Sequence, residues 1–262
     1  MTWSELFLAP KISASFLKVW QRNFLQFRKT WMVSAVWILI EPLMYLGGFG
    51  FGLGAFVNNM NGLSFLEFFF PGLLCTTAMF VAFFEGTYSN YSKLTYQKIY
   101  SSIMMTRVSP EEIVFGEILW AASKAFLGVC GVTLVAAIFG LVDSPFIFVA
   151  LPVLFIVSWL FSSIAMIITS FAKSYDSFIY GTSGFIIPMT LVGGVYFPND
   201  QLPSAFQYFT YLLPLTHAVS AIRGLLVNGF SQEFAVHLVI LLLMSWITMN
   251  IAIIRIRKKL LK

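Results

Sequence analysis

The sequence predicts an all-α, polytopic membrane protein with six transmembrane helices. Of its 262 residues, 59% are hydrophobic and only 10% are charged, and the mean hydropathy is +0.85. A soluble domain carries about 25% charged residues. Each of six apolar segments has close to the roughly 20 residues that a helix needs to cross a bilayer core. They lie at about 32–56, 65–88, 112–141, 146–172, 178–197 and 235–255.

The positions of the basic residues predict the orientation of these segments. Lysine and arginine concentrate in the cytoplasmic loops of membrane proteins. With both termini placed in the cytoplasm, all 16 basic residues fall on that side except Arg223, which is outside, and Lys124, which is within the membrane. We therefore expect one transmembrane domain over 1–262 with both termini cytoplasmic. The net charge of +5 does not indicate a nucleic-acid partner.

The N-terminal stretch 1–31 is predicted to contain an amphipathic helix lying on the membrane surface. Its aromatic residues recur at steps of three and four, which places them on one helical face, and its cations fall elsewhere. This pattern suits the headgroup boundary of a bilayer. The alternative is a helix packed on another subunit. The aromatic residues are Phe16, Trp20, Phe24, Phe27 and Trp31, and the cations are Lys18, Arg22 and Lys29.

The longest polar stretch, 89–111, is predicted to be a cytoplasmic coupling segment. A short helix over 93–106 would carry Tyr96, Tyr100 and Met104 at i, i+4 and i+8, the spacing of a helix laid in a groove. Basic residues beside this stripe could pair with acids of a partner. The alternative is an interfacial helix resting on lipid. The residues expected to couple to the partner are Tyr96, Gln97, Lys98, Tyr100, Met104 and Arg107.

The third segment begins with a motif typical of a helix start. Ser109 is in a position to cap the helix, Pro110 suits its first position, and Glu111 and Glu112 place acids in its first turn.

A second broken stretch, 198–234, is predicted to be re-entrant from the extracytoplasmic side. Pro198, Pro203 and Pro214 cut it into short pieces, because each removes a backbone donor and clashes with the preceding turn. Non-helical backbone at membrane depth persists only where it is buried in protein or faces a watery cavity. We expect one short helix near 204–213. The alternative is a surface loop with interfacial aromatic residues.

Four charged residues are predicted to lie within the membrane: Glu41, Glu85, Glu117 and Lys124. Such residues are costly and usually pair with one another or line a path. Glu41 and Lys124 lie at similar depths, which would let them pair. Glu85 and Glu117 share a shallower level near the cytoplasm. Structural ion pairs and a proton relay are the two interpretations.

Motifs for common enzymatic chemistry are absent from the sequence. There is no G-x-x-x-x-G-K-[ST] phosphate loop, no H-E-x-x-H zinc motif and no G-x-S-x-G elbow. Cys75 and Cys130 both lie in apolar runs, as expected for small buried side chains rather than a disulfide or metal site. We therefore predict a protein that is not an enzyme and binds no metal or cofactor itself.

Three stretches resemble ABC-2 type transporter permeases, in particular the nodulation lipo-oligosaccharide export permeases. They are 109–124, read as Ser-Pro-Glu-Glu-Ile-Val-Phe-Gly-Glu-Ile-Leu-Trp-Ala-Ala-Ser-Lys, then 193–203 and 213–223. The resemblance implies a homodimer of six-span subunits in a bacterial inner membrane. It also implies two separate ATPase subunits, on which ATP and Mg bind, and a coupling helix between the second and third spans.

The expected function is to carry an amphiphilic glycolipid, lipo-oligosaccharide, polysaccharide or similar molecule outward. In this family the path would lie at the dimer interface, with Phe197, Phe206, Tyr208 and Phe209 as substrate path or outer gate. An amphiphile needs an apolar wall with some polar groups, and tyrosine supplies both. One alternative is an ion-coupled secondary transporter or channel, which would transport without an ATPase. Another is a purely structural subunit.

Overall fold

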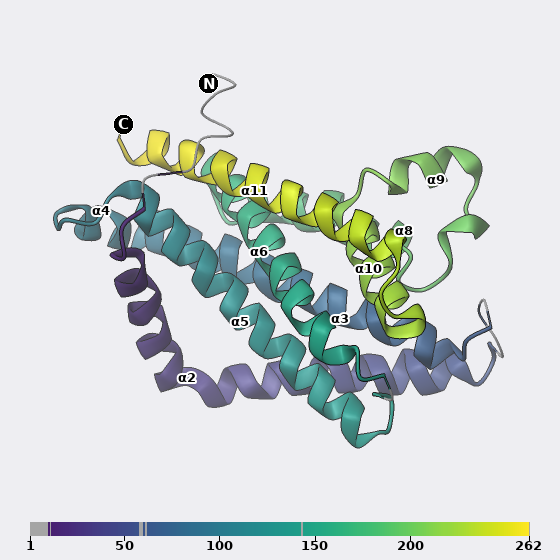
Figure 1. Cartoon of the computed structure of the whole chain (residues 1–262). Helices are drawn as coiled ribbons and strands as arrows, with labels where there is room; N and C mark the ends of the chain where they lie inside the picture. Colours follow the sequence, from purple (N-terminus) through teal and green to yellow (C-terminus); the bar gives the residue numbers. More distant parts are fainter. Residues whose placement is uncertain (1–9, 11, 58–59, 61, 143, 262) are drawn as a thin grey trace.

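The computed structural model describes residues 10, 12–57, 60, 62–142 and 144–261; at positions 35, 37–39, 41, 42 and 51 it describes the backbone only. Every regular element among these residues is a helix, apart from one isolated bridge between Met60 and Leu63. The helices pack as a bundle with connections at both ends (Figure 1). The predicted all-α class is confirmed.

The long elements, in chain order, are α2 (Phe16–Tyr45), its π-helical continuation η1 (Leu46–Leu53), α3 (Phe65–Phe84), α5 (Pro110–Ile138), α6 (Ile147–Phe171) and α11 (Gln232–Leu260). The shorter elements are η2 (Glu85–Ser89), η3 (Ser92–Tyr96), α4 (Ile99–Met104), α7 (Ser177–Gly181), η4 (Thr182–Ile186), α8 (Ile187–Val192), η5 (Asn199–Gln201), α9 (Ser204–Thr210) and α10 (Pro214–Asn228).

Several helices are long and apolar enough to cross a membrane, as the sequence predicted. In the described part of the chain four pass this test alone, and α9 with α10, bent by 86°, passes it as a pair. Such a bend is that of a broken span or a re-entrant segment. The protein is therefore a polytopic membrane protein. The four helices are Phe65–Tyr96, Pro110–Ile138, Ile147–Phe171 and Gln232–Leu260.

The first and fifth predicted segments have a different form. The first, predicted over 32–56, corresponds to the end of α2 and to η1. The fifth, predicted over 178–197, is a shorter apolar helix over Ser177–Val192. It ends early because Gly194 has φ 79°, a left-handed conformation that glycine adopts without steric cost and that does not continue a helix.

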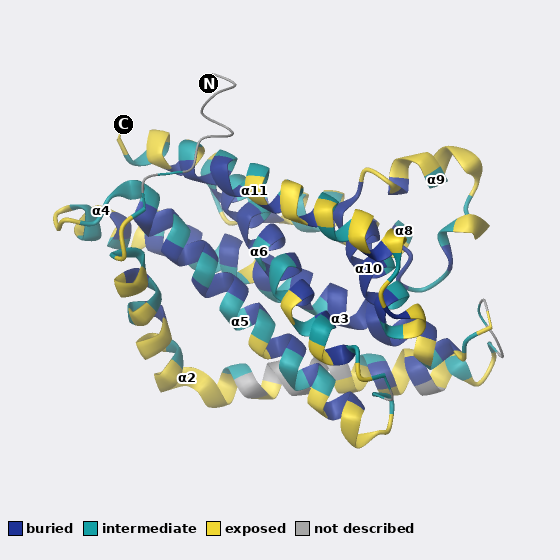
Figure 2. Ribbon diagram, viewed as in Figure 1, coloured by how far each residue is buried: buried dark blue, intermediate teal, exposed yellow. Residues whose placement is uncertain are grey.

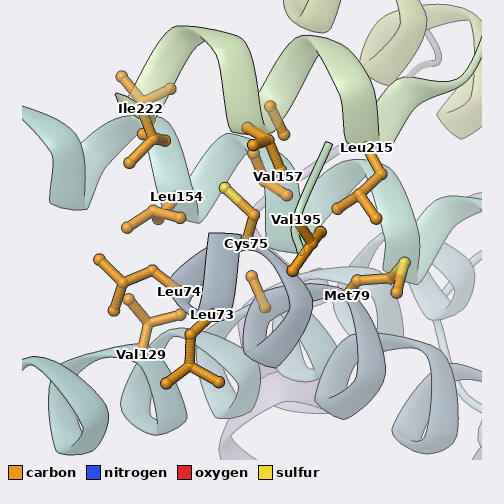
Figure 3. Packing of buried hydrophobic residues seen from close by; sticks show 14 of the residues in the cluster. Leu73, Leu74, Cys75, Met79, Val129, Leu154, Val157, Val195, Leu215 and Ile222 are labelled. Atoms are coloured by element: carbon orange, nitrogen blue, oxygen red, sulfur yellow. The ribbon is translucent and has the colours of Figure 1, made fainter. Parts of the chain in front are cut away.

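The core of the bundle surrounds α3. Figure 3 shows Cys75 and Met79 of α3 among Val129 of α5, Leu154 of α6 and Leu215 of α10. All five side chains are buried. Figure 2 shows burial along the chain: α3 and α6 are largely buried, whereas α2 and α9 are largely exposed. The core thus holds α10 and the turn before it against the spanning helices.

A bend divides α2 into two parts. Thr30 has non-helical dihedral angles (φ −121°, ψ 16°), and the helix changes direction near it (Figure 1). The first part lies against α5 at Gly116, where an added Cβ would be 2.7 Å from the carbonyl oxygen of Phe16 and 2.8 Å from Cβ of Val19. Only glycine permits this close approach of two backbones.

The aromatic face of the first part of α2 packs on α5 of the same chain. The ring centroids of Phe27 and Trp120 are 5.6 Å apart, and Nε1 of Trp20 donates to Oγ of Ser123 at 3.1 Å. α5 offers an aromatic ring and a hydroxyl acceptor to the part of this face that it covers, whereas Phe24 and Trp31 remain 38% and 51% exposed. The predicted place of this helix on the membrane surface stays a prediction.

The two ends of the bundle carry different groups of elements. At one end, here called the α4 end, Val19 of α2, Tyr100 of α4 and Ile113 of α5 form a buried cluster on which Leu260 of α11 packs. The helix cap predicted at Ser109 is present there, as a capping box with Glu112. At the other, the α9 end, are α8, α9 and the connections on either side of α10 (Figure 1).

Candidate coupling site

The segment predicted to couple to a partner is not one helix. The π-helical turn η3 ends at Tyr96 and α4 begins at Ile99. Between them Lys98 has φ 51° and ψ 28°. A non-glycine residue in this left-handed region interrupts a right-handed helix. The predicted continuous helix over 93–106 is therefore wrong.

The predicted stripe of Tyr96, Tyr100 and Met104 is wrong for the same reason. Tyr96 is 61% exposed, whereas Tyr100 is fully buried. Met104 is half-buried against the cluster of Tyr100. The apolar side of α4 fills the gap between α2 and α5 of its own chain, which leaves it no free stripe. Burial, with a further contribution from the nearby carboxylate of Glu117, raises the pKa of Tyr100 well above its usual value.

The exposed surface at this end is formed by the two turns that flank α4. We call it the α4 tip. Tyr96 stacks on Tyr175 with ring centroids 5.4 Å apart, so its position is fixed although one side is open. Met105 is 89% exposed, and sequence reasoning missed it because it assigned the contact to its half-buried neighbour Met104. The members of the α4 tip are Tyr96, Gln97, Lys98, Met105 and Arg107.

A buried carboxylate lies directly behind the α4 tip. Glu117 of α5 has no exposed side-chain surface. It accepts hydrogen bonds from Nζ of Lys93 at 2.8 Å, from Nη2 of Arg22 at 3.2 Å and from Nδ2 of Asn23 at 2.9 Å. Because Lys93 is on η3 and the other two donors are on α2, this one carboxylate connects three elements.

A second carboxylate extends the network along α5. Glu85 accepts from Nζ of Lys124 at 2.7 Å and from Nε1 of Trp120 at 3.0 Å, and Lys93 is 3.8 Å from it. Lys93 therefore lies between both carboxylates. Buried charges are tolerated when each is paired and hydrogen-bonded, and this network satisfies that condition for Glu85 and Glu117.

The sequence placed some of these residues correctly and misplaced others. The structure brings Glu85, Glu117 and Lys124 into one network, in which Lys124 pairs with Glu85; the expected pair of Lys124 with Glu41 is not tested. The side chain of Glu41 lies outside the described residues. Sequence reasoning missed Lys93 as a partner, because it assigned this residue to the cytoplasmic coupling segment. The spacing of Glu117, Trp120 and Lys124 on one face of α5 was the available signal.

A small polar cavity adjoins the network. Its volume is about 130 Å³, which is room for water molecules. In the adjoining network, Nδ2 of Asn90 and Nε of Arg22 are buried and have no partner among the described residues. The walls of the cavity belong to α2 on both sides of its bend, to η2 and η3 and to α5, so the cavity separates the same elements that the carboxylates join. It is lined by Asn23, Gln26, Phe27, Thr30, Ser34, Glu85, Ser89, Lys93, Trp120 and Lys124.

The residues predicted to form an outer gate lie at the opposite end. Phe206, Tyr208 and Phe209 of α9 are 53%, 78% and 53% exposed, and Phe197 is partly buried before η5. Nε2 of Gln207 donates to the carbonyl oxygens of residues 200 and 202 at 3.0 and 2.8 Å. These bonds hold α9 in place, and its aromatic side chains face away from the core.

The charged groups at the α4 end bind one another. In the described part of the chain, no group of three or more His, Cys, Asp or Glu residues is placed to hold a metal ion. The fold is that of a polytopic membrane protein, with an exposed surface at the α4 tip.

The comparisons with known proteins identify the family. The family described as ABC-2 type transporter matches residues 14–227. Nodulation protein J of Rhizobium meliloti (strain 1021) is 36% identical over 87% of this chain and 87% of its own. Nodulation protein J of Rhizobium leguminosarum bv. trifolii is 33% identical over 100% of both chains. Inner membrane transport permease YadH of Escherichia coli (strain K12) is 26% identical over 78% of this chain and 80% of its own.

This chain belongs to the ABC-2 type transporter family. It is a membrane permease subunit, and ATP hydrolysis in such transporters belongs to a separate ATPase subunit. The permease domain of this family binds no cofactor itself. No solved structure matches this chain.

Proposed function

We propose that this chain is the membrane half of an ATP-driven exporter that moves an amphiphilic glycolipid outward across a bacterial inner membrane. A lipo-oligosaccharide or polysaccharide belongs to the same class of cargo. The observation that carries the proposal is the α4 tip, an exposed surface whose base is locked into the bundle by Tyr100 and by the pair of Lys93 with Glu117. The relatives named Nodulation protein J support the kind of cargo.

The α4 tip is suited to receive the movement of an ATPase subunit. The permease has no nucleotide site of its own in its sequence, so the effect of ATP binding must arrive by contact. Tyr96, Lys98 and Met105 offer an aromatic ring, a cation and an apolar side chain to a groove. The salt bridges of Glu117 then connect the tip to α2 and α5, and a rigid connection passes on rigid-body motion.

The rest of the chain is assigned on this basis. Residues 89–111 form the coupling segment, and both termini lie with the α4 end in the cytoplasm. Residues 1–31 hold the amphipathic helix and 198–234 the re-entrant segment at the outer side. Together they make one transmembrane domain over 1–262.

The active assembly would contain two copies of this chain and two ATPase subunits. The second part of α2 exposes Val36 and Ile40, and α8 exposes Ile187 and Leu191. These apolar faces suit a second copy or lipid. The substrate path would run between the copies, with Phe197, Phe206, Tyr208 and Phe209 at its outer mouth.

Reconstitution tests the proposed function. The purified chain is reconstituted in lipid vesicles, in one sample alone and in another with an ABC ATPase encoded in the same genome. Outward movement of a fluorescent glycolipid is then measured in both. Transport that requires both the ATPase and ATP supports the proposal. Transport by the chain alone, driven by an ion gradient, would show a secondary transporter instead. The grouping of Glu85 and Glu117 in one network argues against that outcome, since a proton relay needs acids spread across the membrane.

A further inference from the structure

A cavity at the α9 end has the composition of a binding site. Its volume is about 600 Å³, within the range of small-molecule sites. The turn after α8, the start of η5, α10 and the first turns of α11 form its walls. The side chains used below are Asn199, Asp200, Tyr211, Thr216, Arg223 and Glu233, all of which line it.

Arg223 supplies a fixed donor to this cavity. Its Nε and Nη2 donate to the carbonyl oxygen of Phe68 at 3.1 and 2.9 Å, and Nη2 also donates to that of Gly194 at 2.7 Å. The guanidinium lies over the Phe68 ring, 3.6 Å from its centroid. No carboxylate among the described residues forms a salt bridge with it. The backbone carbonyls therefore hold Arg223 in place, and its charge remains available to a ligand.

Two further polar groups at the cavity lack partners. Oγ1 of Thr216, on a side chain only 1% exposed, and Oδ1 of Asn199 are buried without a hydrogen-bond partner among the described residues. Leaving such a group unpaired costs free energy, and native proteins rarely do so. Both atoms belong to residues that line the cavity, so a molecule in it could pair with them.

The rim determines the kind of molecule. Asp200 and Glu233 are exposed and add acceptors, and Tyr211, 61% exposed, adds an aromatic ring. Two acids beside one arginine do not suit a strong anion. Hydroxyl groups both donate and accept, so a ring with several hydroxyls can use Arg223, the two acids and the unpaired oxygens together. Its apolar C–H face can lie on the tyrosine ring.

We propose that this cavity binds a sugar ring of the headgroup of the exported molecule. The proposal rests on the proposed function for the identity of the cargo, but its binding chemistry belongs to this chain alone. The cavity lies between α10 and α11, at the end of the bundle opposite the α4 tip (Figure 1). It would hold the headgroup as the molecule leaves the membrane.

Ligand-observed NMR on the full chain in lipid nanodiscs tests this site without an ATPase. The probes are maltotriose, cellotriose and triacetylchitotriose, with inorganic phosphate as the competing anion. At least one trisaccharide is expected to give saturable transfer that phosphate does not displace. Thr216→Val should weaken its affinity about three- to tenfold, the range for one lost hydrogen bond. The matched control Thr190→Val, whose hydroxyl donates to the carbonyl oxygen of Ile186 away from the cavity, should not change it.

The outcomes separate this site from the proposed function. Should Thr216→Val fail to fold, the doubly substituted Asp200→Asn, Glu233→Gln chain, altered only at exposed positions, must weaken binding instead. The site is refuted if no trisaccharide binds saturably, if phosphate alone binds, or if these variants bind sugar as the unaltered chain does. A chain that binds sugar but needs no ATPase for transport would refute the exporter and leave the cavity site standing.

Discussion

The two ends of the bundle differ in how their charged side chains are paired. At the α4 end, Glu85 and Glu117 have cations and hydrogen-bond donors around them, and the adjoining cavity is about 130 Å³. At the α9 end, Arg223 donates hydrogen bonds only to carbonyl oxygens, and the hydroxyl of Thr216 has no hydrogen-bond partner in the described chain; the cavity there is about 600 Å³. Ion pairs join elements into one body, whereas a cation without a carboxylate partner beside open space can bind a ligand.

The largest expected effect comes from removing a paired charge at the α4 end. Glu117→Gln leaves the buried Lys93 and the partly buried Arg22 without their carboxylate, which should lower the free energy of unfolding by about 3–5 kcal/mol. Urea unfolding in nanodiscs, followed by tryptophan fluorescence, measures it. The control is Glu111→Gln, which breaks the exposed pair with Arg257 and should cost at most about 1 kcal/mol. Equal losses in the two variants would mean that the Glu117 network does not stabilise the fold.

A second substitution tests the contact between α2 and α5 without changing any charge. Gly116→Ala places a methyl group 2.7 Å from the carbonyl oxygen of Phe16, so α2 must move, at a cost of about 1–3 kcal/mol. The movement should also change the fluorescence of Trp20 and Trp120. Gly128→Ala, whose added carbon meets side chains no closer than 3.6 Å, is the control. An unchanged spectrum and stability in Gly116→Ala would contradict the close approach.

The two ends of the bundle show which features the sequence could predict and which it could not. Apolar length and helical periodicity predicted the spanning helices, because bilayer thickness sets that length. The proline spacing predicted the broken segment at the α9 end. The role of Lys93 was not predictable, because the π-helical turns that bring it beside Glu117 leave no hydrophobic pattern. Nor was the left-handed Lys98, on which the exposure of the α4 tip depends, since a single residue determines it.

The α4 tip is expected to lose partner affinity when its exposed side chains are truncated. Tyr96→Ala together with Met105→Ala should weaken association with the ATPase subunit at least about tenfold, since aromatic anchors are often worth about 2 kcal/mol. Titration of the ATPase onto nanodisc-bound permease measures this. Phe148→Ala removes an equally exposed ring from α6, 76% exposed, and should have no effect on affinity. Wild-type affinity in the doubly substituted chain would show that the ATPase binds elsewhere.

The smallest effects should come from two hydroxyl groups, one at each end, that have no partner among the described residues. Tyr100→Phe removes a hydroxyl from a closed core, and Thr216→Val removes one from the wall of a cavity. Because neither loses an internal hydrogen bond, both should change the free energy of unfolding by less than about 1 kcal/mol.

The two variants should differ only in binding. Tyr100→Phe should retain both ATPase affinity and sugar affinity, because the side chain is fully buried and touches no partner. Thr216→Val should lose sugar affinity alone. Measuring the free energy of unfolding, the ATPase affinity and the sugar affinity of both variants tests the comparison directly. Loss of ATPase affinity in Tyr100→Phe would support the docking role that the sequence spacing of Tyr100 suggested. In that case α4 would have to move away from α2 and α5 when the partner binds.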